Sequence, residues 1–102
     1  AAYKGNDDLA KLLLAHGAAV DAAMNDGATP LIVAAYKGND DLAKLLLAHG
    51  AAVDAAWNNG ATPLIVAAYK GNDDLAKLLL AHGAAVDAAK NNGATPLSIA
   101  AE

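Results

Sequence analysis

The chain has 102 residues, of which 56% are apolar, 18% charged and only 4% aromatic, and its formal net charge is -4. It contains no cysteine, which excludes a disulfide framework and any thiolate site, and its acidic balance argues against nucleic acid as the partner because phosphate binding needs a basic surface. Its apolar runs are far shorter than the ~20 residues that span a bilayer, so we expect no membrane segment.

Three consecutive 33-residue segments, 4–36, 37–69 and 70–102, are nearly identical. The first two differ at Met24 against Trp57 and at Asp26 against Asn59, and the third departs from the second at Lys90, Ser98, Ile99 and Glu102. A period of this length is typical of a stacked repeat array. The close identity of the copies indicates either recent duplication or a designed sequence, and it favours the designed one.

In chain order, the first helix of a complete copy is expected to begin at Thr29-Pro30, where the threonine hydroxyl caps the helix and proline suits its first position. This helix runs to residue 37 and ends at Gly38, a residue type that stops helices. Small side chains such as Ala34, Ala35 and Ala43 are expected where stacked helices approach each other closely.

A second helix is expected to follow at once. Asn39 offers an N-cap, and the two aspartates behind it suit the positive end of the helix dipole. Leu42, Leu45 and Leu46 recur at helical spacing and predict the buried face of this helix. The helix is expected to stop at His49-Gly50. The equivalents of Leu46 in the other copies are Leu13 and Leu79.

Residues 51–61 are expected to form a projecting finger. Asn59-Gly60, which is Asp26-Gly27 in the earlier copy, is a dipeptide that tolerates the positive φ angles of a tight hairpin turn. The predicted fold class is therefore all-α, with helix, turn and helix followed by a β-hairpin finger in each copy.

One set of motifs resembles the ankyrin repeat in order and spacing: Gly27-Ala-Thr-Pro-Leu31, Ala34-Ala35, Gly38, Leu45-Leu46-Leu47 and Gly50-Ala51. The resemblance implies a solenoid of antiparallel helix pairs, with a concave protein-binding surface formed by the fingers and the first helices. Where the family usually has a histidine that ties neighbouring repeats, this chain has Ile32, Ile65 and Ser98, so we expect that polar tie to be missing.

We predict that residues 1–102 form a single array of about three repeats, incomplete at both ends. Terminal repeats need a polar outer face, because an uncapped array exposes the surface that a neighbour would cover. Nothing polar protects Leu9, Leu12 and Leu13. We therefore expect either that the array stacks head to tail with a second molecule or that further residues cover this end.

No catalytic, cofactor or metal site is predicted, so we do not expect an enzyme. His16, His49 and His82 occupy one repeat position, and packed neighbouring helices lie ~8 to 10 Å apart. Zinc ligands must lie ~2 Å from one ion, so a ladder of this kind forms no site. Asp40 and Asp41 are interpreted as charges at a helix start rather than as an acid and base pair.

The predicted function is non-covalent binding of a protein, with no nucleic-acid or membrane partner. The candidate contact residues lie on the fingers and at the ends of the first helices: Met24, Asn25, Asp26, Tyr36, Lys37, Trp57, Asn58, Asn59, Tyr69, Lys70, Lys90, Asn91 and Asn92. Trp57 is either a contact anchor, since tryptophan is enriched at interface hot spots, or a marker placed by a designer. The alternative function is a designed structural scaffold that has no natural partner and can stack on itself head to tail.

Overall fold

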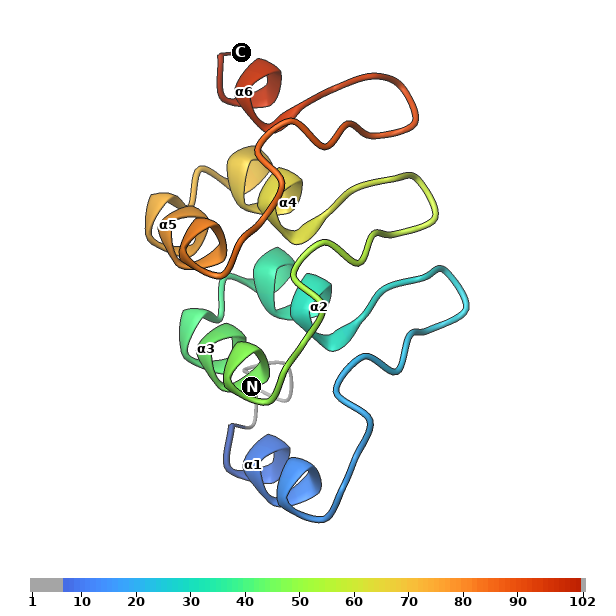
Figure 1. Cartoon of the computed structure of the whole chain (residues 1–102), viewed down its shortest axis with the longest axis vertical. Coiled ribbons are helices and arrows are strands. Elements are labelled where there is room, and N and C mark those ends of the chain that lie inside the picture. Colours follow the sequence, from blue (N-terminus) through green and yellow to red (C-terminus); the bar gives the residue numbers. More distant parts are fainter. Residues whose placement is uncertain (1–6, 102) are drawn as a thin grey trace.

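The structure is a computed structural model that describes residues 7–101. Within that range the chain forms six helices and no strand. Their bounds are α1 Asp7–Ala15, α2 Pro30–Lys37, α3 Asp40–Ala48, α4 Pro63–Lys70, α5 Asp73–Ala81 and α6 Pro96–Ala100 (Figure 1). The expected all-helical array is confirmed.

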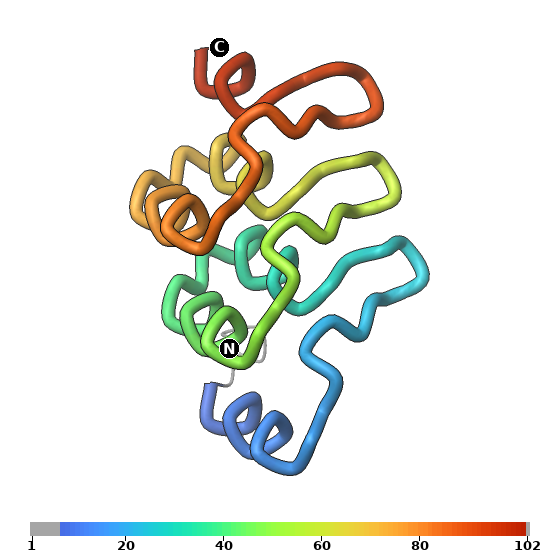
Figure 2. The backbone as a smooth tube through the Cα atoms, in the orientation of Figure 1, coloured from blue at the N-terminus to red at the C-terminus, as the bar shows by residue number. Residues whose placement is uncertain are grey.

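The helices form two parallel rows. One row holds the first helices of the copies, in which α4 contacts both α2 and α6. The other row holds the second helices, in which α3 contacts both α1 and α5. In addition, α2 contacts α3 and α4 contacts α5, so each of these two first helices forms a pair with the second helix that follows it. Residues 18–28, 51–61 and 84–94, here called the first, second and third fingers, project to the same side of these rows (Figure 2).

The predicted caps explain where the helices begin and end. The Thr29 hydroxyl accepts a hydrogen bond of 3.3 Å from the Ile32 N–H, and the Asn39 side chain accepts one of 3.1 Å from the Leu42 N–H. Gly38 ends α2 with a φ of 71°, which lies in the left-handed region that favours glycine.

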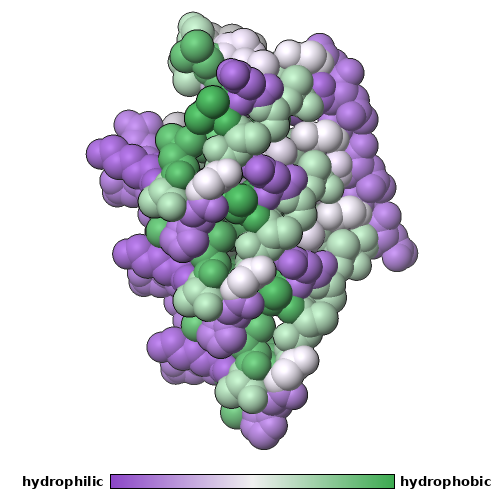
Figure 3. Space-filling model, in the orientation of Figure 1, coloured by the Kyte–Doolittle hydropathy of each residue, from purple (hydrophilic) through white to green (hydrophobic). Residues whose placement is uncertain are grey.

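Large and small side chains divide the core between them. Leu31, Ile32 and Leu79 are fully buried, and Ala35 and Ala43, where close approach of the helices was expected, are also buried, at 0% exposed. On the face drawn in Figure 3, apolar residues form a band along the array that polar residues interrupt and that lies between two polar edges. Small residues thus bring the helices together and the leucines and isoleucines fill the space between them.

The leucine face was predicted only in part. Leu46 and Leu79 are buried as expected, but Leu42 and Leu45 are half-buried and Leu47 takes a place in the core instead. The expected equivalence of Leu13 is wrong, since its side chain is 51% exposed. The reason is that α1 packs mainly against α3, whereas α3 packs against α1, α2 and α5.

The fingers are loops rather than the expected β-hairpins, because the structure has no strand between residues 7 and 101. Each loop is closed by a tight turn. In the second finger the Trp57 N–H donates to the Ala61 carbonyl and the Gly60 N–H donates to the Trp57 carbonyl, both at 2.9 Å. Only the glycine takes a positive φ, of 87°, and Asn59 does not.

Polar ties between repeats are present even though Ile32, Ile65 and Ser98 stand where the ankyrin motif usually has a histidine. The Asn58 and Asn91 N–H groups donate to carbonyls of the preceding finger, at 3.0 and 2.9 Å. At the finger base, the Asp54 carboxylate accepts a hydrogen bond of 3.0 Å from the Ala85 N–H of the next copy. In this chain the polar ties between repeats lie at the fingers and at the helix starts instead of at the histidine position.

Candidate protein-binding site

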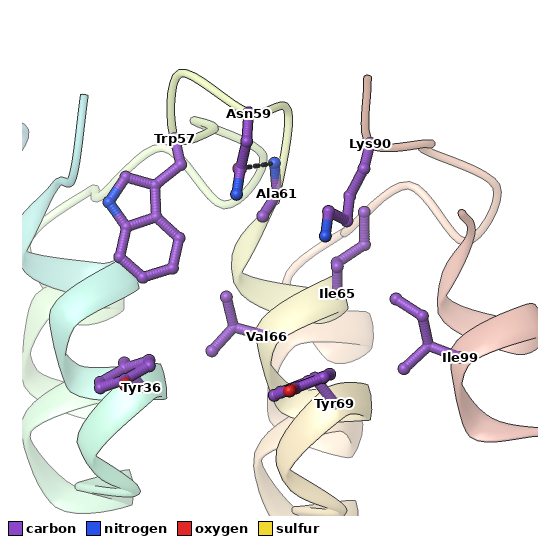
Figure 4. A pocket seen from close by; sticks show the side chains of 9 residues that line it. All are labelled: Tyr36, Trp57, Asn59, Ala61, Ile65, Val66, Tyr69, Lys90 and Ile99. Carbon is purple, nitrogen blue, oxygen red and sulfur yellow. Dashed lines mark hydrogen bonds between the residues drawn. The ribbon is translucent and has the colours of Figure 1, made fainter. Parts of the chain in front are cut away.

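One pocket lies between the second and third fingers, over the ends of α2, α4 and α6. Its volume is about 210 Å³. Its lining consists of three aromatic rings, from Tyr36, Trp57 and Tyr69, four aliphatic side chains, from Ala61, Ile65, Val66 and Ile99, and two polar ones, from Asn59 and Lys90. Figure 4 shows Trp57 and Lys90 hanging from neighbouring fingers on two sides of Val66.

The Trp57 side of the pocket is built by contacts between repeats. The Trp57 ring meets the Tyr36 ring edge to face, with the centroids 5.9 Å apart and the planes at 76°. On the same tyrosine, the Lys70 ammonium lies 4.1 Å from the ring centroid, a cation–π contact. Tyr36 therefore receives one side chain from the second finger and one from α4, and these contacts fix that wall.

The opposite side of the pocket is more open. Lys90 is half-buried, and Tyr69 is 75% exposed. Lys90 occupies the repeat position that holds Trp57 in the preceding copy. The pocket is thus flanked by a tryptophan on one finger and by a lysine at the same position of the next.

The structure brings five of the predicted contact residues to this pocket, namely Tyr36, Trp57, Asn59, Tyr69 and Lys90, and places Lys70 against Tyr36. The others lie apart from it. Met24 is 57% exposed on the first finger, and Lys37 is exposed at the end of α2. Asp26 and Asn58 meet Trp57 and Asn59 at a separate, shallow depression.

The polar residues of the finger tips have internal hydrogen bonds. The Asp26, Asn59 and Asn92 side chains each accept one from the N–H two residues further on, at 2.9 to 3.0 Å. The Asn58 and Asn91 side-chain amides donate to the Asn25 and Asn58 carbonyls of the preceding fingers, at 3.4 and 3.0 Å. These side chains shape and stack the fingers.

Sequence reasoning missed the aliphatic floor of the pocket. Val66 lies three residues before Tyr69 on α4, a spacing that places two helical side chains on one face. Ile99 occupies the position of Val66 in the last copy. That spacing could have identified the floor, but the fingers that complete the pocket come from other copies and required the fold.

The histidines lie at helix ends, with His49 and His82 as the C-caps of α3 and α5. The His49 Nδ1 lies 3.0 Å from the Leu45 carbonyl oxygen. Between residues 7 and 101, no three His, Asp or Glu side chains come together in a way that could hold a metal ion. Every helix in that same range is too short or too polar to cross a bilayer.

Two family models match the chain. One, described as ankyrin repeats in three copies, covers residues 1–56, and another, described as ankyrin repeats in many copies, covers residues 46–100. The chain belongs to the ankyrin repeat family. Ankyrin repeats are non-catalytic modules that generally mediate protein–protein binding. A comparison with curated proteins finds no match.

Proposed function

We propose that residues 1–102 act as one non-enzymatic array that binds a protein through its fingers and the ends of its first helices. The observation that carries this proposal is the pocket beside Trp57. It gathers three aromatic rings and a lysine at a surface where two fingers meet. Tryptophan and tyrosine contribute most often to binding hot spots, and they do so where a pocket excludes water.

The finger tips support the same assignment. Their asparagine and aspartate side chains hydrogen-bond within and between fingers, so the loops are held in place before any partner arrives. A surface ordered in advance loses little side-chain and loop freedom on binding, which favours affinity. The exposed rings and lysines around the pocket are then the groups that a partner would meet.

Capture from a cell lysate with two matched double variants tests this surface. Tyr69→Ala with Lys90→Ala alters the proposed face, and Lys44→Ala with Lys77→Ala removes exposed charges from the second helices. We expect wild type and the second-helix variant to enrich the same protein and the pocket variant to lose it. That protein, once purified, must titrate against the wild-type chain with the same pattern.

The opposite pattern would favour the alternative function. If the pocket variant retains everything that the wild-type chain captures, the proposed face is not the binding surface. If the wild-type chain enriches nothing above an unrelated ankyrin array, a designed scaffold with no natural partner is the better description. The near-identity of the three copies already supports a designed origin.

We also propose that the isolated 102-residue chain associates head to tail. On α1, Leu9, Leu12 and Leu13 are 47%, 55% and 51% exposed. At the other end of the array, a pocket of about 400 Å³ between α4, α5 and α6 exposes Leu80 and Leu97. The helices α1 and α3 have the same nine-residue sequence, and α3 packs against α2 within the chain. The α1 helix of a second copy would therefore bring to that pocket a helix of the same kind.

Sedimentation over a range of concentrations tests this association. We expect the mean mass to rise with concentration for the wild-type chain and to stay at the monomer value for Leu12→Lys with Leu13→Lys. A wild-type chain that remains monomeric throughout the range would contradict the proposal.

A further inference from the structure

We propose that the pocket between the second and third fingers takes a single aromatic or branched apolar side chain of the partner, and that Lys90 binds a carboxylate next to it in the partner's chain. This inference rests on the proposed protein-binding function and specifies its ligand chemistry. The partner it describes is a protein segment in which an apolar residue adjoins an acidic one.

The size of the pocket selects one side chain. A buried cavity of about 150 Å³ holds a benzene ring, and pockets for drug-sized ligands run from about 300 to 1,000 Å³. At about 210 Å³, the pocket beside Trp57 accommodates one ring or one branched aliphatic group with little room to spare. It is too small for a nucleotide or a larger cofactor.

The walls select an apolar group. Val66 and Ile99 present aliphatic surface from α4 and α6, and the Trp57 ring stands on one side, held by its contact with Tyr36 (Figure 4). Because that ring is already partly buried against the core, its position does not depend on the ligand. An incoming ring would meet an aromatic edge and an aliphatic floor, which favours apolar burial.

The charge at the edge selects an acidic neighbour. Lys90 lines the pocket, and none of its described lining residues is acidic. The Asp26 carboxylate lines an adjoining depression that shares Trp57 and Asn59 with the pocket, and it accepts a hydrogen bond from the Ala28 N–H. A second cation, Lys70, is placed over Tyr36 at the adjacent wall. Lys90 is therefore the charged side chain among the described residues that line the pocket, and its ammonium complements a carboxylate.

Four capped peptides that differ at two central positions test the inference, carrying Phe-Asp, Phe-Asn, Ala-Asp or Ala-Asn between glycines. Trp57 is the chain's only tryptophan, so its emission reports directly on the pocket. We expect saturable binding of the Phe-Asp peptide, weakened on the order of tenfold by Phe→Ala through lost apolar burial. Replacing Asp by Asn should weaken it about two- to fivefold, as expected for a partly exposed ion pair.

Two protein variants test whether Lys90 binds the carboxylate of the peptide. In Lys90→Gln the preference for Asp over Asn should vanish while the preference for Phe over Ala remains. Lys77→Gln, an exposed lysine on α5, should keep both preferences and serves as the matched control for net charge. Proton–nitrogen NMR spectra of the same samples should place the shifts at the second and third fingers.

The inference is overturned if the Phe-Asp peptide gives no saturable change up to about 10 mM, a concentration that would reveal very weak binding. It is overturned equally if Lys90→Gln keeps the preference for Asp. In either case the capture experiment with Tyr69→Ala and Lys90→Ala still decides the proposed function separately, because a partner can occupy the fingers without inserting a side chain.

Discussion

The side-chain amide of Asn72 donates a hydrogen bond of 2.8 Å to the carboxylate of Asp40, one repeat earlier in the chain. The oxygen of the same amide accepts one of 3.1 Å from the Leu75 N–H and so caps α5. Asn39 does the same between Asp7 and the start of α3. In the second and third copies, one asparagine therefore both begins a helix and joins it to the previous repeat.

Two substitutions at Asn72 separate these roles. Serine caps helices about as well as asparagine but is too short to reach Asp40, so Asn72→Ser should lower the free energy of unfolding by about 0.5 to 1.5 kcal/mol, the net value of one hydrogen bond. Asn72→Ala should cost roughly 1 kcal/mol more, since the cap is also lost. Urea titrations with an unchanged slope would measure both steps, and an Asn72→Ser variant as stable as the wild-type chain would show that the tie to Asp40 contributes nothing.

Gly60 is expected to tolerate no side chain. Its φ is 87°, and a Cβ atom there would lie 2.8 Å from the Asn91 backbone nitrogen of the next finger. Gly93 has the same φ with nothing within 4 Å, so it isolates the cost of the backbone conformation. Gly93→Ala should cost about 1 to 2 kcal/mol, and Gly60→Ala a further 1 to 3 kcal/mol for overpacking. Thermal or urea unfolding of the pair checks this, and equal costs would contradict the close finger contact.

Leucine truncations should distinguish the inner copies from the first. Leu46→Ala and Leu79→Ala remove fully or nearly fully buried side chains and should each cost about 2 to 5 kcal/mol. Leu13→Ala changes a side chain that is 51% exposed and should cost much less, about 1 kcal/mol. Urea titrations at dilutions where the chain is monomeric provide the comparison. A cost for Leu13 equal to that for Leu46 would show that α1 is covered as α3 is.

The contact between Tyr36 and Trp57 should appear as a coupling energy. A double-mutant cycle with Tyr36→Leu and Trp57→Leu should give about 0.5 to 1.5 kcal/mol, as for other edge-to-face aromatic pairs. Tyr69 is the matched control, because it occupies the same repeat position but lies with Lys90 on the more open side of the pocket. Its cycle with Trp57 should give close to zero, and equal couplings would contradict the specific ring contact.

The helices of this chain could be predicted almost residue by residue from the sequence, because Thr29, Pro30, Gly38 and Asn39 act on groups within a few residues of themselves. The leucine pattern did not predict the exposed state of Leu13, which follows from the uncovered end of the array, since exposure there depends on which helices surround α1. The fingers resembled hairpins because Asn59-Gly60 suits a hairpin turn, but a turn requires only local bonds and a strand requires a paired neighbour.

In the candidate site, too, some residues could be found from the sequence and others could not. Trp57 and Lys90 could be found from sequence because the copies differ there and almost nowhere else. The use of Asn58 and Asn91 as internal ties could not, since each donates to a residue of the preceding finger. Contacts that cross repeats become visible only when the spacing between copies is known.

The narrow spacing at Gly60 has a mechanical consequence. The fingers already approach so closely there that a single added carbon would collide with the next finger. Bending the array toward its finger side would press backbone against backbone at this point, so we expect the fingers to limit that motion. Trp57 contacts Tyr36 across one boundary between repeats, so a change in the spacing of the fingers would also change that ring contact.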